Sequence, residues 1–149
     1  MIIVERTDPH HPGAVALLQQ SHALMRSLFP PEENSFLEID DLVAPNIHFF
    51  TARDGTDIVG TGALKLHEGY GEIKSMFVSE SARGKGVADA ILRQIEDQAR
   101  AEKLPTIKLE TGDVLTAAHR LYARHGFELC DVFGDYRSGS RSIFMEKQL

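Results

Sequence analysis

The segment Ser79–Ala88, which is SESARGKGVA, places two glycines and two cations between two strongly patterned stretches of the chain. Residues 70–78 before it (YGEIKSMFV) have the β-branched and aromatic content of a strand. Residues 84–102 after it have apolar positions at three- and four-residue steps, as in an amphipathic helix. Glycines allow consecutive backbone N–H groups to surround phosphate oxygens, and a helix N-terminus adds partial positive charge. The segment therefore predicts a site for a phosphate-bearing ligand.

Two common phosphate loops do not fit this segment. A P-loop requires G-x-x-x-x-G-K-[ST], whereas here Lys85 stands between the glycines and Val87 replaces the hydroxyl that would hold magnesium. A dinucleotide fingerprint requires G-x-G-x-x-G, and Asp89 occupies the position of its third glycine. The pattern that remains is R-G-x-G-x-A after an antiparallel strand.

The chain before the segment predicts a strand, a helix and a three-stranded meander. Residues 1–6 read as a strand, and a helix begins near Pro12 and ends before Pro30. Residues 30–46 predict a surface loop with one short helical turn. The strands 48–53, 58–66 and 70–78 are joined by short turns, which favours an antiparallel meander.

The chain after the segment alternates helices and strands. A helix over 84–102 precedes a strand over 105–111. A second helix, 114–124, has Asp113 as its predicted N-cap and His125-Gly126 as its stop signal. Residues 127–133 and 142–147 predict two closing strands. This order indicates an α/β fold in which a mixed sheet is covered by helices on both faces.

Composition limits the classes of protein that the chain can represent. Its 149 residues predict one domain, 1–149, and 42% hydrophobic with 26% charged residues is typical of a soluble globular protein. The net charge of −6 argues against nucleic acid as a partner, and no apolar run is long enough to span a membrane. The single cysteine, Cys130, excludes an internal disulfide, so we expect a reducing cytoplasmic location. None of the seven histidines lies in an H-x-x-x-H or H-E-x-x-H pattern, so no metal site is expected.

The R-G-x-G-x-A loop resembles the pyrophosphate loop of the GNAT superfamily of acyl-CoA N-acyltransferases. A second signature of that family, A-x-x-L-Y-x-x-x-G-F, is present at residues 118–127, and the resemblance extends from about residue 58 to 127. The segments 109–112 (LETG) and 142–147 (SIFMEK) look like those of a bacterial subgroup of small acetyltransferases. The resemblance implies the GNAT fold, with a mixed central sheet of about six to seven strands, and acetyl-CoA as co-substrate. It also implies N-acetyl transfer to a primary amine, by direct attack through a tetrahedral intermediate.

The resemblance assigns roles to particular residues. The strand end would pair with the pantetheine arm, and the loop would hold the pyrophosphate through its N–H groups. Tyr122 matches the tyrosine that protonates the departing thiolate. The predicted cofactor-binding residues are Met76, Phe77, Val78, Arg83, Gly84, Lys85, Gly86, Val87 and Ala88.

An ammonium group must lose a proton before it can attack, so a base is expected. Glu72 is the first candidate, because some family members place a glutamate on this strand. His67 and Glu68 are alternatives, whereas His119 is a poorer choice because it is expected to face solvent. Cys130 lies outside the motifs and has no base partner in the sequence, so no acyl-enzyme is expected.

Each of these residues also has a structural interpretation. Arg83 and Lys85 can be surface cations, Tyr122 can be a core residue, and Glu72 can be a solvated strand residue or a member of a structural ion pair. The acidic residues 32–33 and 38–41 fit a solvated loop or, alternatively, the recognition of a cationic amine.

Two functions therefore stay open at this point. One is an N-acetyltransferase acting on a small-molecule or peptide amine, and the other is a non-catalytic CoA-binding module that serves as a ligand sensor or interaction domain. The family builds its acceptor pocket from segments that correspond to residues 20–46 and 131–141, which carry no recognisable motif here. A homodimer is compatible with either function.

Overall fold

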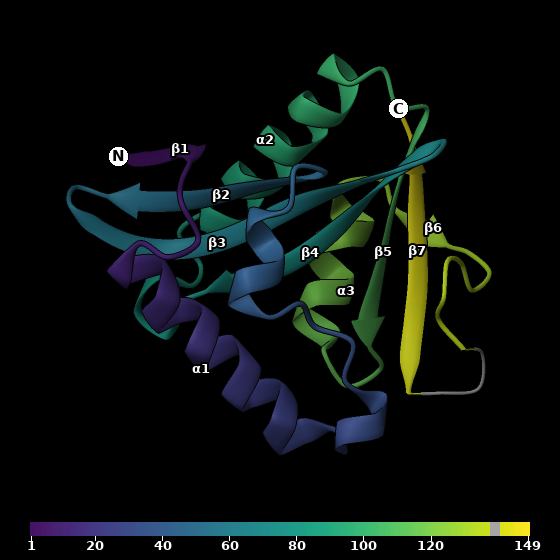
Figure 1. Ribbon diagram of the computed structural model, residues 1–149, viewed down its shortest axis with the longest axis horizontal. Coiled ribbons are helices and arrows are strands. Elements are labelled where there is room, and N and C mark those ends of the chain that lie inside the picture. Colours follow the sequence, from purple (N-terminus) through teal and green to yellow (C-terminus); the bar gives the residue numbers. More distant parts are fainter. Residues whose placement is uncertain (138–140) are drawn as a thin grey trace.

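A computed structural model describes residues 1–137 and 141–149, which form a seven-stranded mixed sheet with three α-helices (Figure 1). The strand order across the sheet is β1-β2-β3-β4-β5-β7-β6. The strands are β1 (Ile2–Arg6), β2 (Ile47–Asp54), β3 (Asp57–His67), β4 (Tyr70–Val78), β5 (Thr106–Gly112), β6 (Glu128–Leu129) and β7 (Ser142–Gln148). The helices are α1 (Pro12–Leu28), α2 (Val87–Ala101) and α3 (Thr116–Arg124), with 3-10 turns η1 (Pro31–Glu33), η2 (Ile39–Val43) and η3 (Glu80–Ala82).

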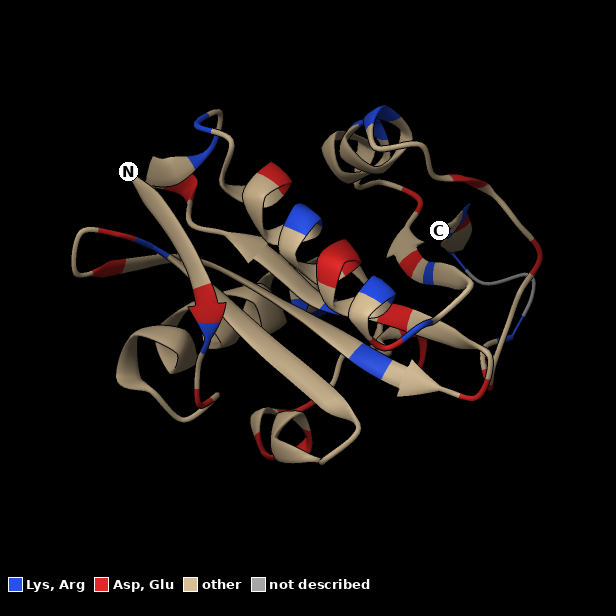
Figure 2. Ribbon diagram, turned by 90° about the horizontal axis from the view of Figure 1, so that it is seen from above, with Lys and Arg blue, Asp and Glu red and all other residues tan. Residues whose placement is uncertain are grey.

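Helices cover both faces of the sheet, which confirms the predicted architecture. The helix α1 lies on one face, and α2 and α3 lie on the other (Figure 1). The apolar residues of α2, such as Ile91 and Ile95, form the larger core cluster together with Leu109 and Tyr122. A smaller cluster forms under α1 around Leu18 and Phe49. The outward side of α2 carries alternating acidic and basic residues, as expected for an amphipathic helix (Figure 2).

The sheet opens between β4 and β5. These two strands are parallel and pair over three positions alone, Gly71–Ile73 with Ile107–Leu109. Farther along, the register of β3 with β4 shifts at a β-bulge, where Ser75 takes a positive φ of 57°. A bulge bends its strand and interrupts the ladder. The diverging strand ends leave an opening in the middle of the sheet, between the two halves of the molecule.

The two glycines of β3 allow α2 to approach the sheet closely. A Cβ atom on Gly60 or Gly62 would overlap the side chain of Ile91 on α2. The absence of side chains at these two positions therefore sets how closely α2, and the loop that precedes it, can lie against the sheet.

The observed helix boundaries differ from the predicted ones at two sites. The helix α2 begins at Val87 rather than at residue 84, because Gly84 and Gly86 have φ values of 78° and 80°, which a right-handed helix does not allow. The helix α3 begins at Thr116, and its N-cap is Leu115 without a side-chain cap bond, so the prediction of Asp113 as N-cap is wrong. The backbone N–H of Asp113 instead donates to the carbonyl of Arg141.

The least regular segments also differ from expectation. Residues 30–46 contain two 3-10 turns rather than one, and in the second of them Glu38 and Asp41 form a capping box. The strand predicted over 127–133 is reduced to the two residues of β6. Residues 138–140, which precede β7, lie outside the described residues.

The described residues provide neither a long apolar helix nor a metal-binding group. Within residues 1–137 and 141–149, no helix is long and apolar enough to cross a membrane. In the same part of the chain, no group of three or more His, Cys, Asp or Glu side chains is arranged to hold a metal ion.

Candidate active site

The glycine loop before α2 is shaped by its two glycines. Gly84 and Gly86 have left-handed φ values, and a Cβ atom added to either would meet no atom within 4 Å. Gly86 is the N-cap of α2 and makes no side-chain cap bond. The first N–H groups of an α-helix have no partner within the helix. The loop therefore presents unpaired backbone donors beside open space, at the positive end of the helix dipole.

A cavity of about 680 Å³, here called the loop cavity, adjoins this loop. Eight of the nine predicted cofactor-binding residues line it: Met76, Phe77, Val78, Arg83, Gly84, Gly86, Val87 and Ala88. Lys85 is exposed and is not among the lining residues. The guanidinium of Arg83 lies 5.9 Å from the ring centroid of Phe77, and its Nε donates to the carbonyl of Val78 at 3.3 Å. The structure thus places the strand end, the glycine loop and the helix start around one space.

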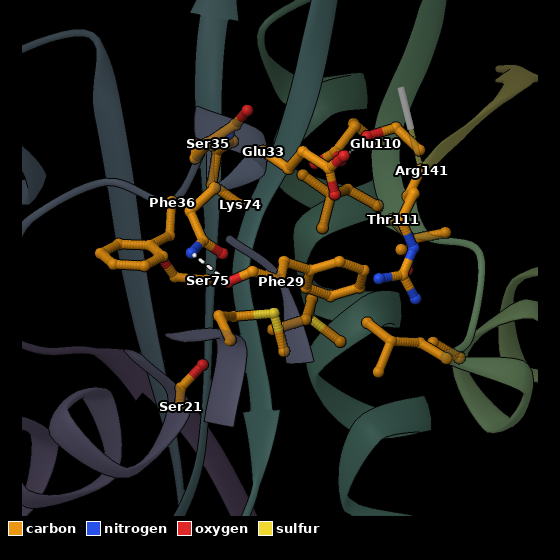
Figure 3. A pocket seen from close by; sticks show the side chains of 18 of the residues that line it. Ser21, Phe29, Glu33, Ser35, Phe36, Lys74, Ser75, Glu110, Thr111 and Arg141 are labelled. Carbon is orange, nitrogen blue, oxygen red and sulfur yellow. Dashed lines mark hydrogen bonds between the residues drawn. The ribbon is translucent and has the colours of Figure 1, made fainter. Parts of the chain in front are cut away.

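A second cavity of about 160 Å³, here called the split cavity, lies where β4 and β5 diverge (Figure 3). Its walls come from α1, from residues 33–36, from the two strand ends, from α3 and from residues 141–142. The residues that line both cavities are Ser21, Met25, Met76, Leu115, Ala118 and Tyr122. The two spaces therefore meet across one shared wall inside the opening of the sheet.

Tyr122 is the titratable residue of this shared wall. Its side chain is only 5% exposed, and its ring packs edge-to-face on Phe127 with centroids 5.7 Å apart. Burial, and secondarily the charge of Glu110, raise the pKa of the Tyr122 hydroxyl. Tyr122 is thus a core residue that also lines both cavities, and its role toward the departing thiolate stays a prediction.

Comparison with known proteins adds an independent observation. A model of the acetyltransferase (GNAT) family matches residues 15–127. The chain belongs to the GNAT family. It is 37% identical to the IAA acetyltransferase of Azospirillum brasilense, over 99% of this chain and 98% of that relative. GNAT membership makes the chain an acetyl-CoA-dependent acyltransferase, and it confirms the resemblance seen in the two sequence signatures.

Solved structures show the same fold. A protein from Klebsiella pneumoniae, provisionally described as an acyl-CoA N-acyltransferase, superposes with a TM-score of 0.84. It is 28% identical, and the match covers 100% of this chain and 98% of that one. A GNAT acetyltransferase from Elizabethkingia anophelis, solved with acetyl-CoA bound, gives a TM-score of 0.74. Its 20% identity, over 99% of this chain and 98% of that one, shows the fold alone.

Glu110 is a residue of the split cavity that the sequence analysis did not single out. It follows Leu109, which packs in the larger core cluster, so the alternation of β5 directs Glu110 to the opposite face and into the split cavity. Burial raises the pKa of its carboxyl group, although the Ser142 hydroxyl donates to Glu110 Oε2 at 2.6 Å and partly offsets this shift. The segment LETG offered a sequence signal for Glu110, because the alternation of a strand places it on the face opposite to that of the core residue Leu109.

Glu72, the first candidate for the base, lies elsewhere. Its side chain is buried and lines neither the split cavity nor the loop cavity. Its carboxylate accepts hydrogen bonds from Tyr136 Oη at 2.5 Å and from His67 Nε2 at 2.9 Å, and it lies 3.6 Å from Lys74 Nζ. Glu72 is thus a member of a structural ion pair, as the alternative interpretation held, although a buried one.

The remaining candidates for the base are also apart from the shared wall. Glu68 is exposed in the turn between β3 and β4. His119 does not face solvent, contrary to expectation: it is half-buried, and its Nε2–H donates to the carbonyl of Gly112 at 2.8 Å.

Burial raises the pKa of the Cys130 thiol, which disfavours the nucleophilic thiolate form.

Proposed function

We propose that the chain transfers the acetyl group of acetyl-CoA directly to a primary amine, with the thioester in the loop cavity and the amine in the split cavity. The shared wall of the two cavities carries this proposal. A thioester at Met76 and Tyr122 would be within reach of an amine that entered from the other side of the opening. Direct transfer requires both reactants to be held against each other, and this arrangement provides that proximity.

The residues around the loop cavity fit acetyl-CoA. The unpaired N–H groups at Gly84, Gly86 and the start of α2 suit a pyrophosphate, and Arg83 adds positive charge at the rim. Beyond the bulge, β4 and β5 are no longer paired with each other, so the edge of β4 is available to the amides of the pantetheine arm. Acetyl-CoA supplies an activated acyl group, and the chain supplies its orientation.

Glu110 and Tyr122 have the chemistry to move the two protons. Glu110 accepts a proton from the ammonium group, and its raised pKa makes it a better base near neutral pH than an ordinary carboxylate. The free amine then forms the C–N bond, and collapse of the tetrahedral intermediate breaks the C–S bond. The hydroxyl of Tyr122 donates a hydrogen bond to the departing sulfur, and the second amine proton is passed to the thiolate to give the free thiol. The raised pKa of Tyr122 favours this hydrogen-bonding role over full transfer of its own proton.

The experiment is a thiol-release assay of the purified chain with acetyl-CoA and a panel of small amines and short peptides. We expect thiol release that depends on one class of amine, with the acetylated amine detected by mass spectrometry. Binding of CoA without turnover on any amine would instead support a non-catalytic module. A cytoplasmic location, which suits a single free thiol, stays a prediction that cell fractionation tests. A homodimer stays a prediction that light scattering tests.

A further inference from the structure

We propose that the acceptor amine also carries a carboxylate, so that the chain acetylates a small free amino acid. This inference rests on the proposed function, since it identifies the occupant of the split cavity. Among the described residues, four charged side chains line that cavity, and their charges are balanced: Glu33 and Glu110 are acidic, and Lys74 and Arg141 are basic. A site with this lining favours a zwitterion over a simple amine or a diamine, either of which would add positive charge beside two cations.

The acidic side of the cavity is suited to an ammonium group. The Oε2 atom of Glu33 is buried and has no hydrogen-bond partner among the described residues. An unpaired buried oxygen of this kind is costly, and an ammonium group has three N–H donors to offer. Glu33 comes from η1 and Glu110 from β5, and both line the same cavity (Figure 3). An amine held by both would lie beside the proposed base.

The segment that carries Glu33 is held in place by its neighbours. Asn34 Nδ2 donates to the carbonyl of Phe29 at 3.3 Å, and Lys74 Nζ donates to the carbonyl of Ser35 at 3.1 Å. The ring of Phe36 stacks on that of His22 at 4.2 Å. Glu33 therefore belongs to a wall with several contacts to α1 and β4, which places its carboxylate before the acceptor arrives.

The basic side of the cavity is suited to a carboxylate, and Arg141 is the better placed of its two cations. Lys74 Nζ already donates to Ser35 and to the Tyr136 hydroxyl, at 2.7 Å for the latter. The guanidinium of Arg141 lies 5.1 Å from the ring centroid of Phe29, with Nη1 3.4 Å from the carbonyl of Leu28 and Nε 3.6 Å from Asp113. A guanidinium has five donors in a planar fork that matches a carboxylate, so donors remain for a ligand.

The volume of the split cavity limits the size of the acceptor. In another protein, an apolar cavity of roughly 150 Å³ holds benzene, which has six carbon atoms. By that comparison, the 160 Å³ here accommodates amino acids of about the size of glycine, alanine or serine. The recognition of a free carboxylate so close to the amine also disfavours the amino terminus of a peptide.

The test compares alanine with amines that lack its carboxylate. Thiol release from acetyl-CoA is measured with alanine, ethylamine, alaninamide and 1,3-diaminopropane, at equal concentrations of free amine. We expect kcat/KM for alanine to exceed that for ethylamine and alaninamide by roughly 10- to 100-fold, the range for a charge-assisted contact. Arg141→Gln should reduce this ratio at least about tenfold. The matched control is Arg93→Gln, an exposed arginine of α2 that lines neither cavity, and it should leave the ratio unchanged.

Binding measured by calorimetry in the presence of CoA separates this inference from the proposed function. If alanine binds in a manner that depends on Arg141 but no thiol is released with any amine, the acceptor class stands and the transferase function fails. If ethylamine and alanine are acetylated equally well, the function stands and the acceptor class is wrong. A preference for the diamine or a peptide, an unchanged ratio in Arg141→Gln, or alanine that neither binds nor reacts would also overturn it.

Discussion

At the scale of single residues, Tyr122 and Glu110 reach the opening of the sheet from its two faces. Tyr122 is carried by α3 and packs with the larger core cluster, whereas Glu110 extends from β5 to the side of α1. Tyr122 is buried and Glu110 is half-buried, and burial raises the pKa of each. A phenol with a raised pKa stays protonated and able to donate, and a carboxyl group with a raised pKa is a stronger base when ionised. Their common burial therefore supports opposite roles.

The first prediction concerns Tyr122→Phe. The phenylalanine ring keeps the edge-to-face contact with Phe127, so the fold and the affinity for acetyl-CoA should change little. Loss of the hydroxyl removes the hydrogen bond to the departing sulfur, and we expect kcat to fall roughly 100-fold. Steady-state kinetics and calorimetry with CoA provide the measurements. Undiminished turnover would assign protonation of the thiolate to another group or to solvent.

The second prediction concerns Glu110→Gln and its pH dependence. Because the base must be ionised, kcat/KM of the natural chain should fall as the pH drops through the raised pKa of Glu110. Glutamine retains the volume and can still accept from Ser142, but it cannot take a proton. We expect the variant to lose roughly 10²- to 10⁴-fold in kcat/KM and to lack this acidic limb.

The matched comparison for Glu110 is Glu72→Gln. Glu72 lines neither cavity, so its variant should keep the acidic limb even if its stability is lower. An acidic limb that disappears in Glu72→Gln and persists in Glu110→Gln would return the role of base to Glu72.

Local sequence motifs predicted some of these residues and not others. Tyr122 and the glycine loop are marked by spacing within ten residues, which a single sequence displays. Glu33, Glu110 and Arg141 meet only because η1, β5 and the start of β7 border the same opening. Glu33 and Arg141 are ordinary surface charges when their own segments are considered alone, and the strand pattern around Glu110 indicates only that it lies opposite a core leucine. Convergence of distant segments depends on tertiary packing, and nothing in their local sequence encodes it.

At the scale of elements, the glycine loop and α2 act together, and the third prediction concerns Gly86→Leu. A side chain there would occupy the open space beside the first N–H groups of α2, so acetyl-CoA affinity should fall at least tenfold. The positive φ of 80° adds a cost of roughly 1–2 kcal/mol to folding, or a Tm decrease of roughly 2–8 °C. Fluorescence titration and thermal unfolding measure the two effects.

Gly69→Leu is the matched control for this loop variant. Gly69 has a φ of 85° in the turn between β3 and β4, and a Cβ there would also meet no atom within 4 Å. Its variant should show a similar decrease in Tm with unchanged affinity. An equal loss of affinity in both variants would assign the effect to stability, and unchanged affinity in Gly86→Leu would contradict the role of the loop.

The hydrophobic periodicity of the sequence predicted the regular helices and strands well. It did not predict features that depend on the backbone conformation of single residues. The strand β4 begins and ends where its pattern indicates, because its pattern and its turn signals agree. The bulge at Ser75 was not predictable, since serine has no preference for a positive φ. A bulge of this kind bends its strand, and this one lies just beyond the last paired position of β4 and β5.

At the scale of the whole molecule, we propose that residues 1–149 form one domain, which is the fourth prediction. The sheet carries core clusters on both faces, and α1 and α2 both pack on β3 and β4. We therefore expect a single cooperative transition, with far-UV circular dichroism and tyrosine fluorescence changing together. Two separated transitions would divide the chain into two units.

The net charge of −6 describes the surface of the molecule and not the proposed site. Acidic and basic residues are interspersed over the ribbon (Figure 2). The rim of the loop cavity carries the cation Arg83, and the split cavity is balanced in charge. The net charge therefore disfavours nonspecific partners such as nucleic acid, whereas the local arrangement of charges determines which substrates fit the cavities.

The three-position pairing of β4 with β5 makes the sheet two half-sheets joined by a short hinge. β1–β4 lie on one side of that joint, and β5–β7 lie on the other. A coenzyme seated along β4 with its acceptor against β5 would tie the half-sheets together, as an inserted strand does. The bound substrates would then stabilise the contact between the two half-sheets, and the enzyme would be most rigid at the moment of transfer.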